Sequence, residues 1–309
     1  MNTKETALYY QNPILKGYAD PDVYYENGIY YLYATSYHVE RGYEVYSSAD
    51  LVHWEKRGMA LTEAWNFKKN YWAPDVKKIG SRYIMAASVE EHLGLAVAKQ
   101  PEGPFVPEEH WLFDCSIDGH IFQDTDGSLY LYYVSWREGH RYGLYGCQLD
   151  ILTLMPVRDS ERLLFVAEEP YECCQAPVVE APYMLCRDGL YYLTYSGSHY
   201  QSPNYCVAAA VSDAPLGEYH RCSENPILIG NEKISGCGHH CIVHTPGGEM
   251  YLLYHTHAAP DGRIHPRQLA LDRLYWENGR LVTSGPTITP QPMPGKNLMR
   301  EYREYKEEL

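Results

Sequence analysis

Five short strand-like segments of the chain carry a residue at one constant place, three positions before the first apolar residue of the segment. These residues are Asp20, Ala73, Asp118, Glu180 and His239. Two carboxyl groups on either side of a substrate can act as general acid and general base, and a third carboxylate beside the acid raises its pKa. Unrelated turn residues would not share one offset, so the pattern favours a common pocket for acid–base cleavage.

Other residues near these places could contact a ligand. Trp72 precedes the small Ala73, and an aromatic ring beside an open space can stack on a sugar, although a purely structural tryptophan fits the sequence nearly as well. Polar side chains that follow the ends of two Tyr-rich strands are expected to reach the same pocket. They are Tyr37, His38, His255 and His257.

Two further groups of residues favour structural roles. Asp22 and Asp75 lie two positions after the shared place, where carboxylates bond to backbone N–H groups at strand ends. The run Cys237–Cys241 contains two cysteines and two histidines but lacks the separated pairs of a structural zinc site. Together with Cys173 and Cys174, these cysteines are interpreted as reduced thiols.

The elements that position these residues form a repeat. Five Tyr-rich strands each follow a glycine, at spacings of 52, 47, 62 and 59 residues, and a further strand-like run comes after each one. The glycines are Gly28, Gly80, Gly127, Gly189 and Gly248. A unit of this length with about four strands predicts an all-β, five-bladed β-propeller over residues 1–290, with a charged C-terminal tail at 291–309. Tandem β-sandwich domains would need a linker near residue 150, and none is visible there. Innermost strands line the central channel, so the shared places meet on one rim.

Composition limits the classes of partner. A formal net charge of −14 disfavours nucleic acid and anionic membranes, and suits a small neutral ligand such as an oligosaccharide. The N-terminal residues lack the apolar run of a signal peptide, and no stretch has the length of a membrane helix, which predicts a cytoplasmic protein. The sequence does not indicate an oligomeric state.

Five motifs, in order and spacing, resemble glycoside hydrolase family 43. They are NPIL with ADPDV at 12–23, WAPDV at 72–76, IDGHIF with DTDG at 117–127, VEAPY with GLYYLTYS at 179–196, and GH at 238–239. Members of this family are inverting enzymes with a five-bladed propeller that remove arabinofuranosyl or xylosyl units from plant-derived saccharides. The acid motif of the family usually reads EGP, and here it is EAP.

The resemblance implies a role for each matching residue. Asp20 would be the general base, Glu180 the general acid, and Asp118 the residue that orients the acid and tunes its pKa. His239 would hold the polar network of the pocket, or the water shell of a calcium or sodium ion in the channel. Arg267 would contact the sugar. No cofactor is required for this chemistry.

The sequence leaves the substrate open. The xylosidases of the family often carry a β-sandwich domain after the propeller, and its absence in this chain tilts the expectation towards an exo-acting α-L-arabinofuranosidase over a β-xylosidase. Two alternatives are a sugar-binding propeller without catalysis, which would lose a carboxylate, and another propeller enzyme such as a glycoside phosphorylase, which would need a basic phosphate pocket.

Overall fold

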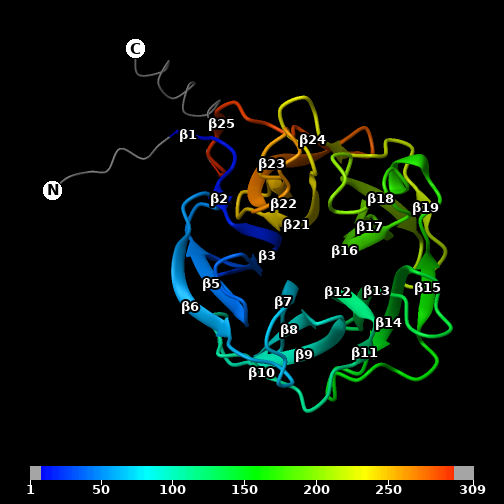
Figure 1. The fold of residues 1–309 in the computed structure, drawn as a ribbon. Helices are drawn as coiled ribbons and strands as arrows, with labels where there is room; N and C mark the ends of the chain where they lie inside the picture. The colour runs from blue at the N-terminus through cyan, green and yellow to red at the C-terminus, as the bar shows by residue number, and fades with distance from the viewer. Residues whose placement is uncertain (1–7, 296–309) are drawn as a thin grey trace.

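The computed structural model describes residues 8–295, and nearly all of its regular structure is β-sheet. Five antiparallel sheets stand around a central axis as the blades of a propeller (Figure 1). The predicted Tyr-rich strands are the second strands of the five blades, so the predicted fold and repeat are confirmed. Blades 1 to 4 are each contiguous in sequence and begin with the innermost strand, whereas blade 5 combines β21 to β24 with the N-terminal β2.

The strands of the first three blades are short and joined largely by hairpins. Blade 1 contains β3 (Tyr18–Glu26), β4 (Ile29–Ser36), β5 (Tyr43–Ser48) and β6 (Glu55–Leu61). Blade 2 contains β7 (Tyr71–Ile79), β8 (Arg82–Val89), β9 (His92–Ala98), β10 (Val106–Pro107) and β11 (Phe113–Asp114). Blade 3 contains β12 (Ser116–Gln123), β13 (Leu129–Ser135), β14 (Gly143–Leu149) and β15 (Arg162–Phe165).

The last two blades follow the same plan. Blade 4 comes after a 3₁₀ turn, η1 (Pro170–Glu172), and contains β16 (Val179–Arg187), β17 (Leu190–Gly197), β18 (Cys206–Ser212), β19 (His220–Arg221) and β20 (Leu228–Ile229). Blade 5 contains β21 (Gly238–His244), β22 (Met250–Thr256), β23 (Gln268–Glu277), β24 (Arg280–Thr283) and the N-terminal β2 (Leu15–Lys16).

Both ends of the described chain close the ring at blade 5. β2 pairs with β23 beside β24. The Asn12 side chain continues this pairing as a strand backbone would, because it accepts a hydrogen bond from Leu271 N at 2.8 Å and donates one to Leu271 O at 3.0 Å. Strand pairing continues past residue 290, because β25 (Gln291–Pro292) pairs with β1 (Tyr9–Tyr10). Residues 296–309 of the predicted tail lie outside the described residues.

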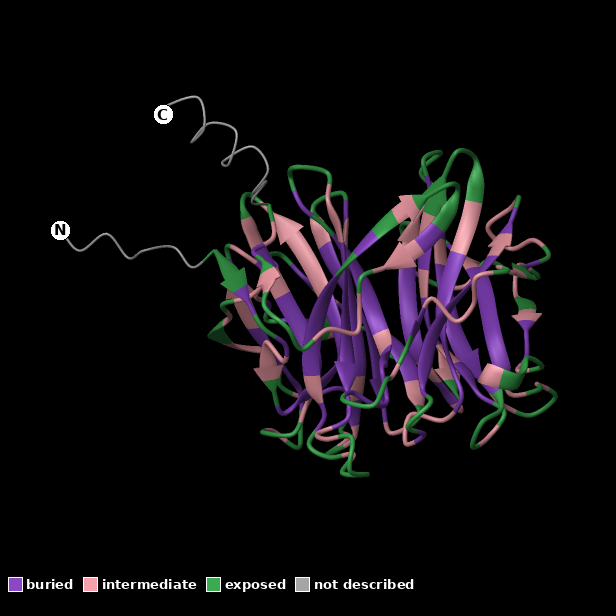
Figure 2. Cartoon of the chain, turned by 90° about the horizontal axis from the view of Figure 1, so that it is seen from above, coloured by how far each residue is buried: buried purple, intermediate pink, exposed green. Residues whose placement is uncertain are grey.

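The core lies between neighbouring blades. Figure 2 shows buried strands between two rims of exposed loops, and the buried apolar side chains form five clusters, one at each junction of two blades. Several tyrosines are fully buried there with the hydroxyl group bonded, as in Tyr43, which donates to Trp72 O at 2.9 Å. This explains much of the tyrosine content, since tyrosine fills a β core while its polar tip still needs a partner.

Carboxylates also tie blades together. Asp22 accepts a hydrogen bond from Val76 N at 2.8 Å, and Asp75 accepts one from Ile121 N at 2.9 Å. These bonds join blade 1 to blade 2 and blade 2 to blade 3, which confirms the predicted structural role of both residues. All nine cysteines are free thiols. None of the helical segments within residues 8–295 has the length and hydrophobicity of a membrane span.

Candidate active site

A β-bulge interrupts the inner strand of every blade near the central axis. The bulged residue has a positive φ of 53° at Asp20, 41° at Ala73, 56° at Asp118 and 42° at His239. Such angles are strained for residues other than glycine, and bulges of this kind redirect a side chain. The sequence pattern had therefore detected a real backbone feature that turns side chains towards the axis.

Blade 4 departs from this pattern by one residue. Its bulged residue is Ala181, with φ of 54°, and Glu180 precedes it while still paired with β17. The first apolar residue of this segment is Tyr183, and counting back from it was wrong. Met184, and not Tyr183, has the strand pairing that matches the first apolar residues of the other blades. Glu180 thus enters the site from a different backbone position than the other two carboxylates.

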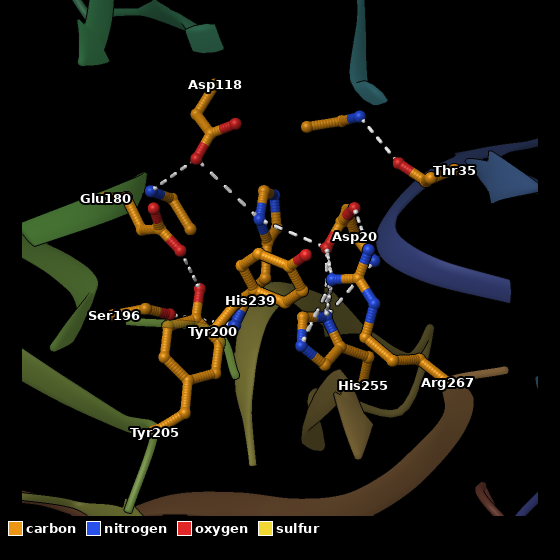
Figure 3. Close-up of polar contacts among 12 residues, drawn as sticks. Asp20, Thr35, Asp118, Glu180, Ser196, Tyr200, Tyr205, His239, His255 and Arg267 are labelled. Carbon is orange, nitrogen blue, oxygen red and sulfur yellow. Dashed lines mark hydrogen bonds and ion pairs between the residues drawn. The ribbon is translucent and has the colours of Figure 1, made fainter. Parts of the chain in front are cut away.

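The carboxylate of Asp20 is buried in a cationic and imidazole environment (Figure 3). Arg267 binds it with both terminal nitrogens, at 2.9 Å and 3.3 Å, and His255 Nδ1 lies 3.0 Å from Oδ1. Burial alone would raise the pKa of Asp20, but the charge of Arg267 together with His239 and His255 lowers it well below its usual range. Asp20 is therefore a carboxylate, suited to act as a base.

Glu180 lies in a different environment and is partly accessible to solvent, whereas Asp20 is buried. Its Oε1 accepts a hydrogen bond from the Tyr205 hydroxyl at 2.7 Å. Burial raises its pKa to about 7, the charge of Asp20 adds to the rise, and the bonds from Tyr205 and Tyr142 oppose it. A carboxyl group with this pKa holds its proton near neutrality, as a general acid must.

Asp118 is bonded to the residue that follows the acid. Its Oδ2 accepts from Ala181 N at 3.1 Å, which fixes the backbone next to Glu180. Burial and then the charge of Glu180 raise the pKa of Asp118 well above its usual range. The charge of Asp20 is the leading one that raises the pKa of Glu180, so the tuning of the acid by Asp118 stays a prediction.

His239 lies between the two sides of the site. Asp118 and Glu180 are on one side of it, and Asp20 with Arg267 on the other (Figure 3). Its Nδ1 is 3.4 Å from Asp20 Oδ1 and 3.8 Å from Asp118 Oδ2, and burial lowers its pKa to about 4, so the ring is neutral at pH 7. Among residues 8–295, no three His, Cys, Asp or Glu side chains are placed together as direct metal ligands.

Three of the remaining candidate binding residues share one depression, and a fourth, Ala73, is buried. Trp72, Tyr37 and Arg267 line a common depression, and Arg267 Nε donates to the Tyr37 hydroxyl at 2.7 Å. Ala73 is buried, with its N–H bonded to Thr35 at 2.9 Å. Arg267 bonds mainly to Asp20. It therefore positions the base, in addition to the expected contact with the sugar.

His257 does not reach the carboxylates, contrary to the expectation from its place at the end of β22. It is buried, with Nε2 2.8 Å from Tyr200 O and Nδ1 3.3 Å from Ser235 Oγ. Both ring nitrogens are therefore occupied in supporting the loop that carries Tyr200. The Tyr200 ring in turn lies 4.9 Å from the guanidinium of Arg267.

Sequence reasoning missed the tyrosines around the acid. Tyr205 and Tyr142 lie outside the repeated strand starts, so no periodic signal marks them. Gly238 indirectly marks the position of Tyr205, because a Cβ at residue 238 would come within 2.2 Å of the Tyr205 ring. Trp136, whose ring stacks on Tyr142 at 5.6 Å between centroids, had no distinguishing pattern either.

Comparisons with known proteins identify the family. A family model described as glycosyl hydrolases family 43 matches residues 10–281. A crystal structure of a thermostable family-43 glycoside hydrolase superposes with a TM-score of 0.86 at 35% identity, covering 93% of this chain and 100% of the other. An endo-1,4-beta-xylanase from Bacteroides thetaiotaomicron gives a TM-score of 0.83 at 30% identity, covering 92% and 99%.

Curated relatives carry several activities. The chain is 28% identical to a beta-D-galactofuranosidase of Aspergillus niger, over 93% of this chain and 88% of the relative. It is also 28% identical to an extracellular exo-alpha-(1->5)-L-arabinofuranosidase of Streptomyces chartreusis, over 80% and 82%. A xylosidase/arabinosidase of Butyrivibrio fibrisolvens is 25% identical over 87% of this chain, which spans 55% of that relative.

Proposed function

The chain belongs to glycosyl hydrolase family 43, and from this premise we propose that it is an inverting O-glycosyl hydrolase with Asp20 as general base and Glu180 as general acid. One observation carries the assignment, namely the unequal environments of the two carboxyl groups. Arg267 keeps Asp20 ionised, whereas burial raises the pKa of Glu180 to about 7. Two carboxyl groups with separated pKa values are the arrangement that acid and base roles require.

The reaction follows from these protonation states. Glu180 gives its proton to the glycosidic oxygen as the bond to the anomeric carbon breaks, while Asp20 takes a proton from the water that attacks the opposite face of the sugar. Asp118 holds the backbone beside the acid, and neutral His239 separates the two sides. The ring passes through an oxocarbenium-like state without a covalent intermediate.

The leaving group departs on the side of Glu180. Tyr142 contributes a hydrogen bond to this acid, and the Trp136 ring stacks on Tyr142 with an interplanar angle of 20°. Aromatic faces of this kind accept the apolar face of a sugar ring. We therefore place the departing sugar unit of an oligosaccharide beside Trp136.

The sugar that is released forms the finer part of the proposal. We propose α-L-arabinofuranosyl, or β-D-xylosyl, units of plant-derived oligosaccharides, in keeping with the activities named for the relatives. The Aspergillus niger relative adds galactofuranosyl as a third candidate, because that match covers most of both chains. The proposed reaction requires no cofactor, since Asp20 itself activates the water.

Hydrolysis of aryl glycosides tests the proposal. We expect release of the aryl alcohol from at least one of the α-L-arabinofuranoside, β-D-xyloside and β-D-galactofuranoside, and at least a ~10²-fold loss in Asp20→Asn, because acid–base groups contribute about 10²–10⁴-fold. Inactivity of the wild-type enzyme on all three substrates would contradict the proposed activity. Unchanged turnover in Asp20→Asn would contradict the role of Asp20.

A further inference from the structure

A buried glutamate outside the site, Glu172, lies in the 3₁₀ turn that precedes blade 4. Hydrogen-bond donors surround its carboxylate. Oε1 accepts from the Tyr195 hydroxyl at 2.5 Å and from Arg221 Nε at 3.0 Å. Oε2 accepts from Arg221 Nη2 at 3.2 Å and from the backbone N–H groups of Glu168 at 2.7 Å and Glu169 at 3.0 Å. Burial would raise the pKa of Glu172, but these bonds, led by the one from Arg221, lower it, so Glu172 is ionised.

The backbone of Glu172 connects this anchor to the end of β17. Its carbonyl oxygen accepts from Val178 N at 3.1 Å and from Ser198 N at 3.2 Å. A Cβ added at Gly197 would lie 3.4 Å from both Cα and Cγ of Glu172, so the glutamate packs directly against this glycine. The turn therefore fixes both the end of β17 and the chain that enters β16.

Gly197 is the strand position that joins the acid to its tyrosine partner. It pairs on one side with Val179, the residue before Glu180, and on the other side with Cys206, the residue after Tyr205. The Tyr205 hydroxyl donates to Glu180 Oε1 at 2.7 Å (Figure 3). Movement of Gly197 would therefore shift the two partners of this hydrogen bond relative to each other.

We propose that Glu172 is a positioning residue for the reaction, which holds Gly197 in place and thereby keeps the Tyr205 hydroxyl on Glu180. The inference rests on the proposed function, because this bond governs turnover only if Glu180 is the general acid. The proposed route differs in sign from a direct charge effect. Removal of a negative charge would lower the pKa of Glu180, whereas a looser bond from Tyr205 would raise it.

Different titratable and charged groups face the two glutamates. Outside its own backbone donors, Glu172 faces Arg221, Tyr195, Tyr171, Cys173 and Cys206, whereas Glu180 faces Tyr205, Tyr142, Asp118, Asp20 and Arg267. A change at Glu172 is therefore expected to reach Glu180 through the strand positions of blade 4.

An NMR titration measures the pKa of Glu180 without turnover. In enzyme labelled with ¹³C-glutamate, the carboxyl signal that is absent from Glu180→Gln belongs to Glu180. In Glu172→Gln, whose amide nitrogen cannot accept from the surrounding donors, we expect this pKa to rise by at least about 0.5 unit. Tyr195→Phe removes a single bond and keeps the ion pair, so it should raise the pKa by a smaller amount. The alkaline limb of kcat/KM should move upward with the pKa in both variants.

Two further variants complete the experiment. Glu172→Gln introduced into Tyr205→Phe should give no further rise, because the hydroxyl that transmits the effect is already absent. Glu44→Gln is the matched control, since Glu44 is a buried glutamate of blade 1 that accepts from Tyr18 at 2.9 Å and pairs with Lys56. It should lower the melting temperature and leave the pKa of Glu180 unchanged.

Two results would overturn the proposal. An unchanged or lowered pKa of Glu180 in both Glu172→Gln and Tyr195→Phe, with only a lower melting temperature, would show a purely structural role. A full further rise in the Tyr205→Phe background would show that the effect does not pass through the hydroxyl. A pKa that rises as expected while the alkaline limb stays in place would support the positioning of the Tyr205 bond and refute Glu180 as the general acid.

Discussion

Replacement of Tyr205 by phenylalanine tests how a single hydrogen bond controls the pKa of the proposed general acid, Glu180. The Tyr205 hydroxyl donates to Glu180 Oε1 at 2.7 Å and so favours the ionised carboxylate, whereas its ring, stacked on His255 at 5.5 Å, is kept in Tyr205→Phe. A hydrogen bond to a charged group contributes about 1.5–3 kcal/mol, and one pKa unit corresponds to about 1.4 kcal/mol. Loss of the bond should therefore raise the pKa of Glu180 from about 7 by about one unit or more.

The expected change appears in the pH dependence of kcat/KM. The protonated acid is the active form, so activity falls as pH rises through the pKa of Glu180. At pH 8 the protonated fraction should increase from about a tenth in the wild type to about a half in Tyr205→Phe, which moves the alkaline limb upward by about one unit. A substrate with a poor leaving group should be used, because its cleavage needs the proton.

A matched control removes a similar buried bond that does not involve Glu180. Tyr254 donates to Asp272 at 2.7 Å within blade 5, and Tyr254→Phe should lower stability while leaving the pH profile in place. An alkaline limb that stays fixed or moves downward in Tyr205→Phe, while the control behaves as expected, would refute the reasoning on Glu180.

Three further predictions concern the same groups. Arg267→Lys removes the bidentate contact that lowers the pKa of Asp20, so the acid limb of kcat/KM should move to higher pH. An acid limb at the wild-type pH would show that Arg267 does not lower the pKa of Asp20. Asp118→Asn should lower turnover of natural linkages about tenfold or more with an unchanged circular dichroism spectrum, whereas a wild-type rate would remove its orienting role. Proton NMR should show that the first product formed has the anomeric configuration opposite to that of the substrate, and retention would contradict the single-displacement mechanism.

The fold could be predicted because its signal repeats. Each blade needs a hairpin with a buried second strand, and the glycine before each Tyr-rich strand, as at Gly28 with φ of 86°, meets the same turn geometry five times. The bulged positions of Asp20 and Asp118 were detected for the same reason. Glu180 was found one residue out of register, because Tyr183 is the first apolar residue of its segment, whereas Met184 has the strand pairing that matches the other blades.

The loops around the site could not be predicted in this way. Tyr205 and Tyr200 come from the segment between β17 and β18, where side-chain direction depends on contacts with other blades and not on local periodicity. His257 illustrates the opposite error, because its place at a strand end resembled that of His255, yet its ring turns to Tyr200 and Ser235. Of His255 and His257, it is His255 that contacts the base.

The central claim is that Glu180 protonates the leaving group, and its most direct test compares two leaving groups in Glu180→Gln. The account predicts a loss of about 10²–10⁴-fold in kcat/KM on natural oligosaccharides, and a loss of less than about tenfold on a dinitrophenyl glycoside, whose leaving group needs no proton. Equal losses on both substrates would contradict the assignment of Glu180 as the general acid.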